Sequence, residues 1–248
     1  MPRWGKALIA IAVTLLVLAG AGELGLRSII PGVVEGQVRE QLNLPKSHPV
    51  DVALGGSTLL HALQGGVGNI DVEVPDAQVT DGVEATLSFH ADRVPFAVTS
   101  GEMSGATASA YVSSANLGPV ISTLTNGLAD EGRTLGGSLI VGKTISAFGF
   151  SVPLEGTLKL SVTDGDVRVE PTGLSAVGFD LSTDQIVAAT GGLLEPLLSA
   201  RVVCIADQIP AGITLDGVDV ATGGVRVDVV IADDFLSNAA ERDLGTCA

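Results

Sequence analysis

The residues whose spacing best matches a known chemical site are Gly137–Thr144, which read GSLIVGKT. They satisfy the pattern G-x-x-x-x-G-K-[ST] of a phosphate-binding P-loop. In a P-loop a strand precedes the motif and a helix follows it, so that backbone N–H groups and the helix N-terminus face the phosphates. Here residues 139–141 are themselves strand-like, and residues 145–152 lack a helical repeat. The sequence therefore predicts a β-hairpin segment at this motif.

Three histidines and two acidic pairs are the other candidates for acid–base or metal chemistry. They are His48, His61 and His90, Asp164 with Asp166, and Asp233 with Asp234. No spacing assigns a histidine the serine and aspartate of a hydrolytic triad, and the G-x-S-x-G motif is absent. EF-hand spacing is absent too, and three histidines with two cysteines do not supply a conventional zinc cluster. We therefore expect no cofactor, no metal and no catalytic residue, with a hydrolase centred on His61 or His90 as an alternative.

Charge and aromatic content exclude two further classes of ligand. The chain has 13 basic and 28 acidic residues, a net charge of −15, which repels nucleic acid. Its eight aromatic residues are too few for the stacked rings that bind single strands or sugars. The chain is 46% hydrophobic, so it has ample material for a buried core.

Residues 1–22 have the composition of a targeting segment. Two basic residues precede an apolar run at residues 7–18, and Ala19-Gly20-Ala21 has the small-x-small form that signal peptidase reads. The sequence predicts a signal peptide cleaved after Ala21 or an uncleaved membrane anchor, and export to the periplasm or cell envelope in both cases. Residues 23–248 contain no low-complexity linker, and we expect them to form a single domain.

Export favours a disulfide between the two cysteines, Cys204 and Cys247. Such a bridge would tie the C-terminus to a helix-like segment, and a loop of this size contributes about 4 kcal/mol in the chain-entropy model. Two unpaired, buried thiols are the alternative.

Hydrophobic periodicity predicts an α+β fold with antiparallel strands. Amphipathic helices are expected over residues 27–43, 114–130 and 183–201. Alternating strands are expected over residues 50–54, 70–74, 83–89, 157–162, 166–170, 213–220 and 225–231. Ser182 with Gln185 forms a capping box before the third helix, and Asp164-Gly165 is a hairpin turn signal. Each strand thus has a polar and an apolar face, and the apolar faces form either a solid core, which composition alone favours, or a cavity for acyl chains.

Four segments carry a resemblance to a known family. They are the amphipathic helix ending Gln41–Pro45, the glycine-flanked patch and short helix Val52–Gly65, the strand Asn69–Val74, and Cys204–Leu215 with the terminal Gly245-Thr246-Cys247. Over most of residues 27–247 this layout resembles the LmeA-like phospholipid-binding family of actinobacterial envelope proteins. The chain departs from the family at Ser57–Leu60, where members often have aromatic residues.

The resemblance implies an exported, non-catalytic domain that binds phospholipid and supports mannolipid or envelope lipid assembly or transport. It also implies a curved antiparallel sheet wrapped on amphipathic helices, similar to tubular, BPI-like lipid-binding proteins. The expected partners are phospholipid acyl chains and a membrane surface, with no nucleic acid. The alternatives are a solid-core structural or interaction protein without lipid cargo, and an envelope hydrolase.

The apolar stripes supply the candidate lipid-binding residues, since each buried CH₂ group of an acyl chain contributes about 0.8 kcal/mol. Leu59, Leu60 and Leu63 are expected at a mouth or membrane-touching rim. The expected wall residues are Leu117, Ile121, Leu124, Leu193, Leu194, Leu197 and Leu198. Arg93, Lys143 and Arg201 are candidate cations for an anionic headgroup.

Overall fold

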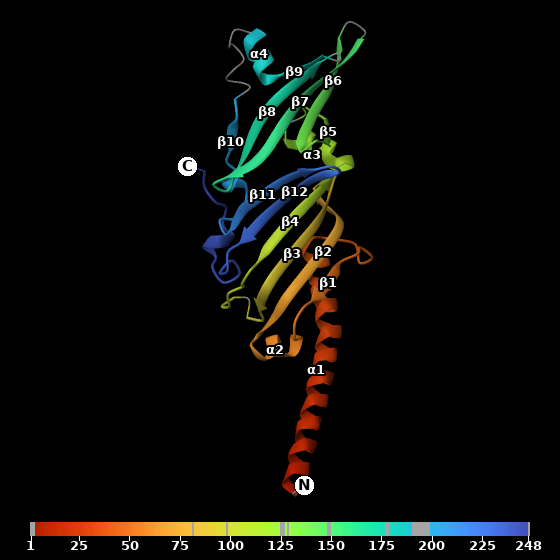
Figure 1. Cartoon of the computed structure of the whole chain (residues 1–248), viewed down its shortest axis with the longest axis vertical. Coiled ribbons are helices and arrows are strands. Elements are labelled where there is room, and N and C mark those ends of the chain that lie inside the picture. Colours follow the sequence, from red (N-terminus) through yellow and green to blue (C-terminus); the bar gives the residue numbers. More distant parts are fainter. Residues whose placement is uncertain are drawn as a thin grey trace.

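The structure is a computed structural model, and it describes residues 3–80, 82–97, 99–124, 127, 129–147, 150–176, 179–189 and 199–247. Within these ranges side chains are described except at residues 3–21, 80, 123–124, 145–147, 150–152, 176, 179, 186–187 and 189. The molecule is elongated, with two antiparallel sheets stacked along its long axis and one long helix projecting from the end (Figure 1). The fold is therefore α+β and mostly antiparallel sheet, as the sequence predicts.

The N-terminal helix is longer than the periodicity predicts. α1 runs from Arg3 to Gln41, so the helix expected over residues 27–43 is continuous with the apolar N-terminal segment. Ion pairs one turn apart, Arg27 with Glu23 at 2.7 Å and Arg39 with Glu35 at 3.3 Å, stabilise the helix. Where the structure describes side chains, no helix is both long and apolar enough to cross a membrane.

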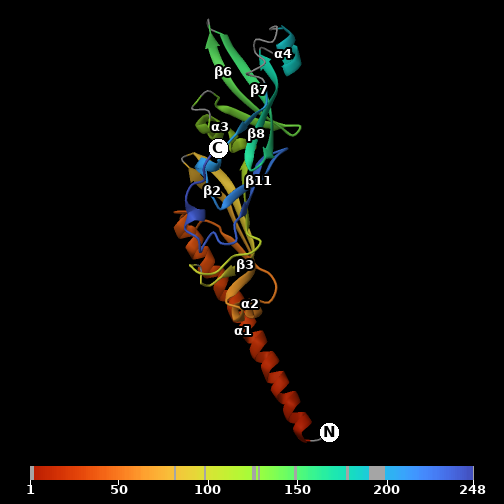
Figure 2. The same ribbon diagram turned by 90° about the vertical axis from the view of Figure 1, so that its left-hand side faces the viewer.

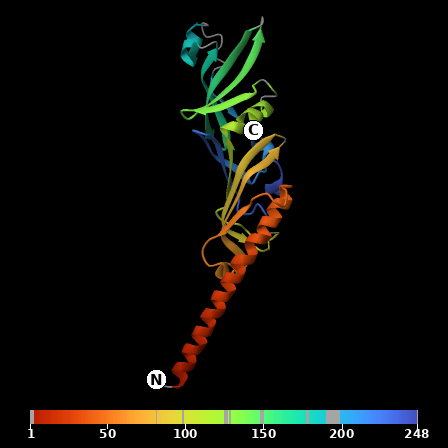
Figure 3. The same cartoon turned by 90° about the vertical axis from the view of Figure 1, so that its right-hand side faces the viewer.

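The first sheet contains six antiparallel strands in the order β1-β2-β3-β4-β12-β11. Their bounds are β1 (Asp51–Leu54), β2 (Gly66–Thr80), β3 (Val83–Pro95), β4 (Thr107–Ser113), β11 (Ile213–Ala221) and β12 (Gly224–Ile231). Each strand predicted in these regions is present, although β2 and β3 extend well beyond the alternating segments. The C-terminal half of α1 lies alongside this sheet (Figure 3).

The second sheet has the order β10-β8-β7-β6-β5, with β9 also paired to β8. Its strands are β5 (Glu131–Leu135), β6 (Ser138–Ala147), β7 (Phe150–Thr163), β8 (Asp166–Ala176), β9 (Phe179–Ser182) and β10 (Arg201–Val203). The P-loop-like motif forms the β5–β6 turn and β6, which confirms the predicted hairpin. The predicted turn between β7 and β8 is also present, with φ of 53° at Asp164 and 82° at Gly165.

The second predicted helix is shorter than expected. The turn η1 (Ser114–Asn116) and α3 (Leu117–Leu124) occupy only the first part of residues 114–130. Gly127 has a φ of 77°, and its N–H donates to the carbonyl oxygen of Ser122 at 2.8 Å. A glycine in this left-handed conformation commonly ends a helix, so the predicted end at residue 130 was wrong.

The third predicted helix begins where expected but does not reach residue 201. α4 spans Thr183–Ala189, and the predicted capping box before it is present. The Ser182 N–H donates to Gln185 Oε1 at 2.8 Å, and the Gln185 N–H donates to Ser182 Oγ at 3.3 Å. Arg201 instead begins β10, because the β-branched Val202 and Val203 continue a strand paired with β8.

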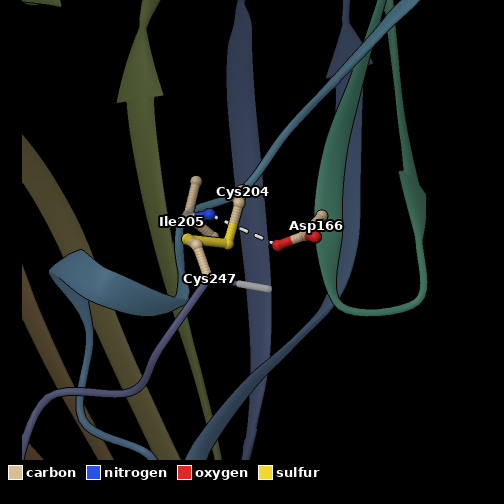
Figure 4. The surroundings of a disulfide bond; sticks show 4 residues. All are labelled: Asp166, Cys204, Ile205 and Cys247. Carbon is tan, nitrogen blue, oxygen red and sulfur yellow. Dashed lines mark hydrogen bonds between the residues drawn. A yellow bond between two sulfur atoms is a disulfide. The ribbon is translucent and has the colours of Figure 1, made fainter.

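The predicted disulfide is present. Cys204 and Cys247 are bonded with their Cα atoms 5.9 Å apart, which closes a loop with a sequence separation of 43 (Figure 4). Cys204 directly follows β10, so the expectation that the bridge meets a helix-like segment was wrong. Next to the bridge, the Ile205 N–H donates to Asp166 Oδ1 at 3.3 Å, which joins this segment to the start of β8. The short turns η2 (Ala206–Gln208) and η3 (Ala240–Arg242) complete the C-terminal region.

Two apolar clusters hold the elements together. The first lies between α1 and the first sheet, where Val34 and Val38 of the helix pack against buried residues such as Val72 and Val74. The second, which we call the junction cluster, contains Leu117, Ile121, Val220 and Val225, with Leu139, Val141 and Leu160 of the second sheet packed against it. The two sheets therefore share apolar contacts where they meet.

Candidate functional site: an apolar groove on the first sheet

The first sheet has one apolar and one polar face, because its register aligns residues of the same kind. Val72 is paired with Phe89 and Val74 with Leu87, and Ala108 and Ala110 of β4 continue this face toward β12. On the opposite face, Asp71 is paired with His90. Partners in an antiparallel pair project to the same side, so the alternation seen in the sequence produces two chemically different surfaces.

A groove lies between α1 and the apolar face of this sheet. Its volume is about 480 Å³. The helix contributes Gln37, Val38, Gln41 and Leu42, and the strands contribute Val72, Val74, Leu87, Ser88, Phe89, Ala108, Ser109, Ala110, Val227 and Val229. None of these lining residues carries a charge. The only polar side chains among them are two amides from α1 and two serines from the sheet.

The groove has the chemistry of a site for a hydrocarbon chain. Its volume falls within the range of about 300–1,000 Å³ that is typical of small-molecule sites. Aliphatic and aromatic walls without charge favour apolar ligands, at about 0.8 kcal/mol for each buried CH₂ group. A charged group would lose its hydration inside the groove without gaining a partner from the lining, so it must stay outside.

The polar face of the same sheet has a hollow with the opposite character. This hollow of about 730 Å³ is lined by acidic side chains that include Asp51, Asp71, Glu73 and Asp228, together with His90. His90 Nδ1 lies 2.7 Å from Asp71 Oδ1, and this hydrogen bond raises the pKa of His90 above its usual value of 6.5. Across the described part of the chain, no three potential ligand side chains are grouped so as to hold a metal ion. This acidic face repels anions and does not suit a phosphate group.

The three leucines expected at a rim lie on the short helix α2 (Thr58–Leu63), at the end of the first sheet where α1 projects away (Figure 2). Leu59 is half-buried, whereas Leu60 is 53% exposed and Leu63 is 78% exposed. None of the three lines the groove. A role at a membrane-touching rim stays a prediction.

The wall residues expected on the second helix lie in the junction cluster. Leu117 and Ile121 are 3% and 4% exposed and pack where the two sheets meet. They lie against Gly132 of β5 so closely that a larger residue there would displace them. The side chain of Leu124 lies outside the described residues, as do Leu193, Leu194, Leu197 and Leu198. Contact between these residues and a lipid stays a prediction.

The candidate cations and histidines do not line the groove. Arg93 donates to the carbonyl oxygen of Gln64 at 2.5 Å, and Lys143 donates to that of Gly127. His48 Nε2 lies 2.8 Å from the carbonyl oxygen of Pro75, and His61 has a buried Nδ1 without a hydrogen-bond partner. Within the described residues, His90 is therefore the histidine with carboxylate partners, and these lie on the acidic face.

The groove residues were missed as a site by sequence reasoning, although their elements were predicted. The signal was the apolar alternation of residues 70–74 and 83–89, which marked one face of the sheet. The periodicity did not show that α1 would cover this face only in part.

One of three comparisons with known proteins gives a match, and it is a family model. A search of curated proteins and a search of solved structures each returned no match. The family model described as LmeA-like phospholipid-binding matches residues 21–230, which include the whole of the groove lining. The match covers most of the chain, and this protein therefore belongs to the LmeA-like phospholipid-binding family.

Proposed function

We propose that this protein is an exported, non-catalytic phospholipid-binding protein of the cell envelope, and that the groove between α1 and the first sheet holds an acyl chain. The observation that carries this proposal is the absence of charge from the lining of a 480 Å³ groove in a member of a phospholipid-binding family. An acyl chain gains from burial there, whereas a charged or strongly polar ligand does not.

The rim of the groove suggests how a phospholipid would lie. Gln37 and Gln41 of α1 are neutral amides, which can donate hydrogen bonds to ester or phosphate oxygens without adding charge. The headgroup would then sit at the α1 side, away from the acidic hollow on the opposite face of the sheet. We expect this arrangement to keep one end of the lipid in water.

The apolar face continues past the groove toward the second sheet. Val225 belongs to the junction cluster, and Val141 of the second sheet packs against that cluster. Val141 is paired with Gly156, and Gly156 with Leu174, so Leu174 lies on the same face of the second sheet. This continuity supports a tubular, BPI-like mode of binding in which acyl chains follow the long axis of the molecule.

The proposed cellular role follows from the N-terminal sequence and the disulfide. The apolar run at residues 7–18 supports export, with the segment either cleaved or kept as an anchor, and the bonded Cys204 and Cys247 fit an oxidising compartment. We propose that the protein supports the assembly or transport of envelope lipids, including mannolipids.

Photo-crosslinking tests the proposed binding mode. The full chain would be loaded with a phosphatidylglycerol that carries a diazirine in one acyl chain, irradiated and digested for peptide mass spectrometry. We expect crosslinks in residues 37–42 of α1 and on β4, and a marked reduction when unlabelled phosphatidylglycerol competes. Crosslinks spread over the whole surface, or resistant to competition, would support the alternative of a solid-core interaction protein.

A further inference from the structure

We infer that α2 and the start of the loop after β3 form a membrane-docking surface that lies in the headgroup region of a bilayer. We define this docking surface by the exposed side chains of Leu60, Leu63 and Phe96. The inference rests on the proposed function, in which lipid must pass between a membrane and the groove, and it names the face that meets the membrane.

The docking surface consists of apolar side chains held out in water. Leu60, Leu63 and Phe96 are 53%, 78% and 56% exposed. They lie close together in the backbone, because the Phe96 N–H donates at 2.9 Å to the carbonyl oxygen of Gly65, two residues after Leu63. A group of exposed large apolar side chains on a folded protein commonly marks a contact with a partner or a membrane.

The first half of α2 is fixed to α1 by a single carboxylate. Glu23 accepts hydrogen bonds from the N–H groups of Thr58 and Leu59 at 2.8 Å and 2.7 Å, and from Ser57 Oγ at 3.1 Å. Arg27 pairs with Glu23 and also donates to the carbonyl oxygen of Gly56, just before the helix. The Thr58 side chain is buried beneath these contacts, at 2% exposed.

The second half of α2 is fixed to the first sheet. Arg93 of β3 donates at 2.5 Å to the carbonyl oxygen of Gln64, which caps the helix. Both ends of this six-residue helix are therefore tied to other elements. Such a short helix is not stable alone, so these contacts determine that Leu60 and Leu63 stay exposed.

The position of α2 on α1 points to a bilayer as the occupant. Leu59 lies 3.6 Å from where a side chain at Gly22 would begin, so α2 packs beside this turn of α1. The apolar run of the N-terminal segment ends at Leu18, four residues earlier and thus about 6 Å along the helix axis. A membrane that takes up residues 7–18 would reach α2 directly.

The charges around the docking surface fit the same occupant. Arg27 donates to the backbone just before α2, where Glu23 balances its charge, and Arg93 donates to Gln64 at the other end of the helix. Interfacial segments commonly combine apolar side chains that enter the acyl boundary with cations that meet lipid phosphates. Arg93 is thus the candidate for contact with a lipid phosphate at the docking surface, in a chain whose overall charge is −15.

Depth-dependent fluorescence tests the inference on the full chain. The variant Leu63→Cys would be labelled with an environment-sensitive fluorophore and reconstituted with vesicles of phosphatidylcholine and phosphatidylglycerol in equal parts. The matched control is Leu135→Cys, which replaces a leucine that is 63% exposed at the end of β5 in the second sheet. Both positions are exposed, so neither change disturbs the core, and formation of the Cys204–Cys247 bond would be verified in each.

We expect the fluorophore at residue 63 to shift to shorter wavelength and to be quenched by nitroxide-labelled lipid, whereas the fluorophore at residue 135 is quenched by aqueous iodide. Equal quenching by iodide at both positions would overturn the inference. The lipid bound by the same samples would also be measured after extraction. This second measurement tests the proposed function independently of the docking surface. A protein that retains groove lipid while residue 63 stays in water refutes only the docking surface, and one that docks without binding lipid refutes only the groove.

Discussion

The carboxylate of Glu23 in α1 accepts a 2.7 Å hydrogen bond from the backbone N–H of Leu59 in α2, 36 residues further along the chain. This contact links the turn of α1 that follows the apolar segment to the helix that carries Leu63, the most exposed leucine among those whose side chains the structure describes. Glu23 therefore makes two kinds of contact. It forms an ion pair with Arg27 within α1, and it accepts hydrogen bonds from the backbone of α2.

Replacing Glu23 with Gln should loosen α2 without unfolding the sheets. The neutral amide keeps an acceptor oxygen but loses the charge-assisted bonds to two N–H groups and to Arg27. We expect faster hydrogen exchange at the Leu59 and Leu60 amides, with exchange in β2 and β3 unchanged. The control is Glu35→Gln, because Glu35 pairs with Arg39 in the same helix at a distance from α2. Equal exchange in the two variants would contradict the proposed linkage.

Acid should release α2 in a defined pH range. The Leu59 N–H, followed by Arg27 and the Thr58 N–H, lowers the pKa of Glu23 from 4.5 to about 2. A carboxyl group with a lowered pKa stabilises the folded state above its unfolded pKa, and this contribution disappears as the pH falls toward the folded pKa. Protection of the Leu59 amide should therefore fall between about pH 4.5 and pH 2. The Glu23→Gln variant should lack this dependence, and retention of it would exclude Glu23 as the cause.

The stability that His90 contributes on the acidic face should fall as the pH rises, whereas the contribution of Glu23 falls as the pH drops. The hydrogen bond to Asp71, with a smaller contribution from Asp92, raises the pKa of His90 above 6.5. The stabilisation from this histidine is fully present below pH 6.5 and is lost as the pH rises through its folded pKa. In an NMR titration, Asp71→Asn should move the pKa of His90 downward. Asp51→Asn, which alters the same hollow without touching the ring, should have a smaller effect. Equal shifts in the two variants would contradict the assigned pair.

Loss of the disulfide should destabilise the protein as a whole. The Cys204–Cys247 bond closes a loop with a sequence separation of 43, which corresponds to about 4 kcal/mol in the chain-entropy model. We expect Cys204→Ser with Cys247→Ser to lower the free energy of unfolding by this order, measured by urea denaturation. Reductant should reproduce the loss in the wild-type chain and leave the double variant unaffected. An unchanged urea midpoint in the double variant would contradict a stabilising bridge.

The strands were predictable from the sequence because apolar and polar residues alternate along each of them. This local pattern agrees with the way the strands pair in the sheets. The alternation of residues 70–74 and 83–89 was by itself enough to identify the apolar face. The helix ends were less predictable, since Gly127 ends α3 by its backbone conformation and Val202 and Val203 join a sheet through distant partners. The groove depends on how α1 crosses β2, β3 and β4, which is a long-range relationship that no local pattern contains.

The most direct test of the account is the lipid content of the purified chain with its groove open or filled. Ala110→Trp places a large ring in the groove, whereas Thr107→Trp places the same ring on the acidic face of the same strand. After detergent removal, extraction and mass spectrometry should find stoichiometric phospholipid in the wild-type protein and in Thr107→Trp, and little in a folded Ala110→Trp. Equal phospholipid in all three proteins, or none in a wild-type protein offered phospholipid vesicles, would contradict the assignment of the groove as the lipid site.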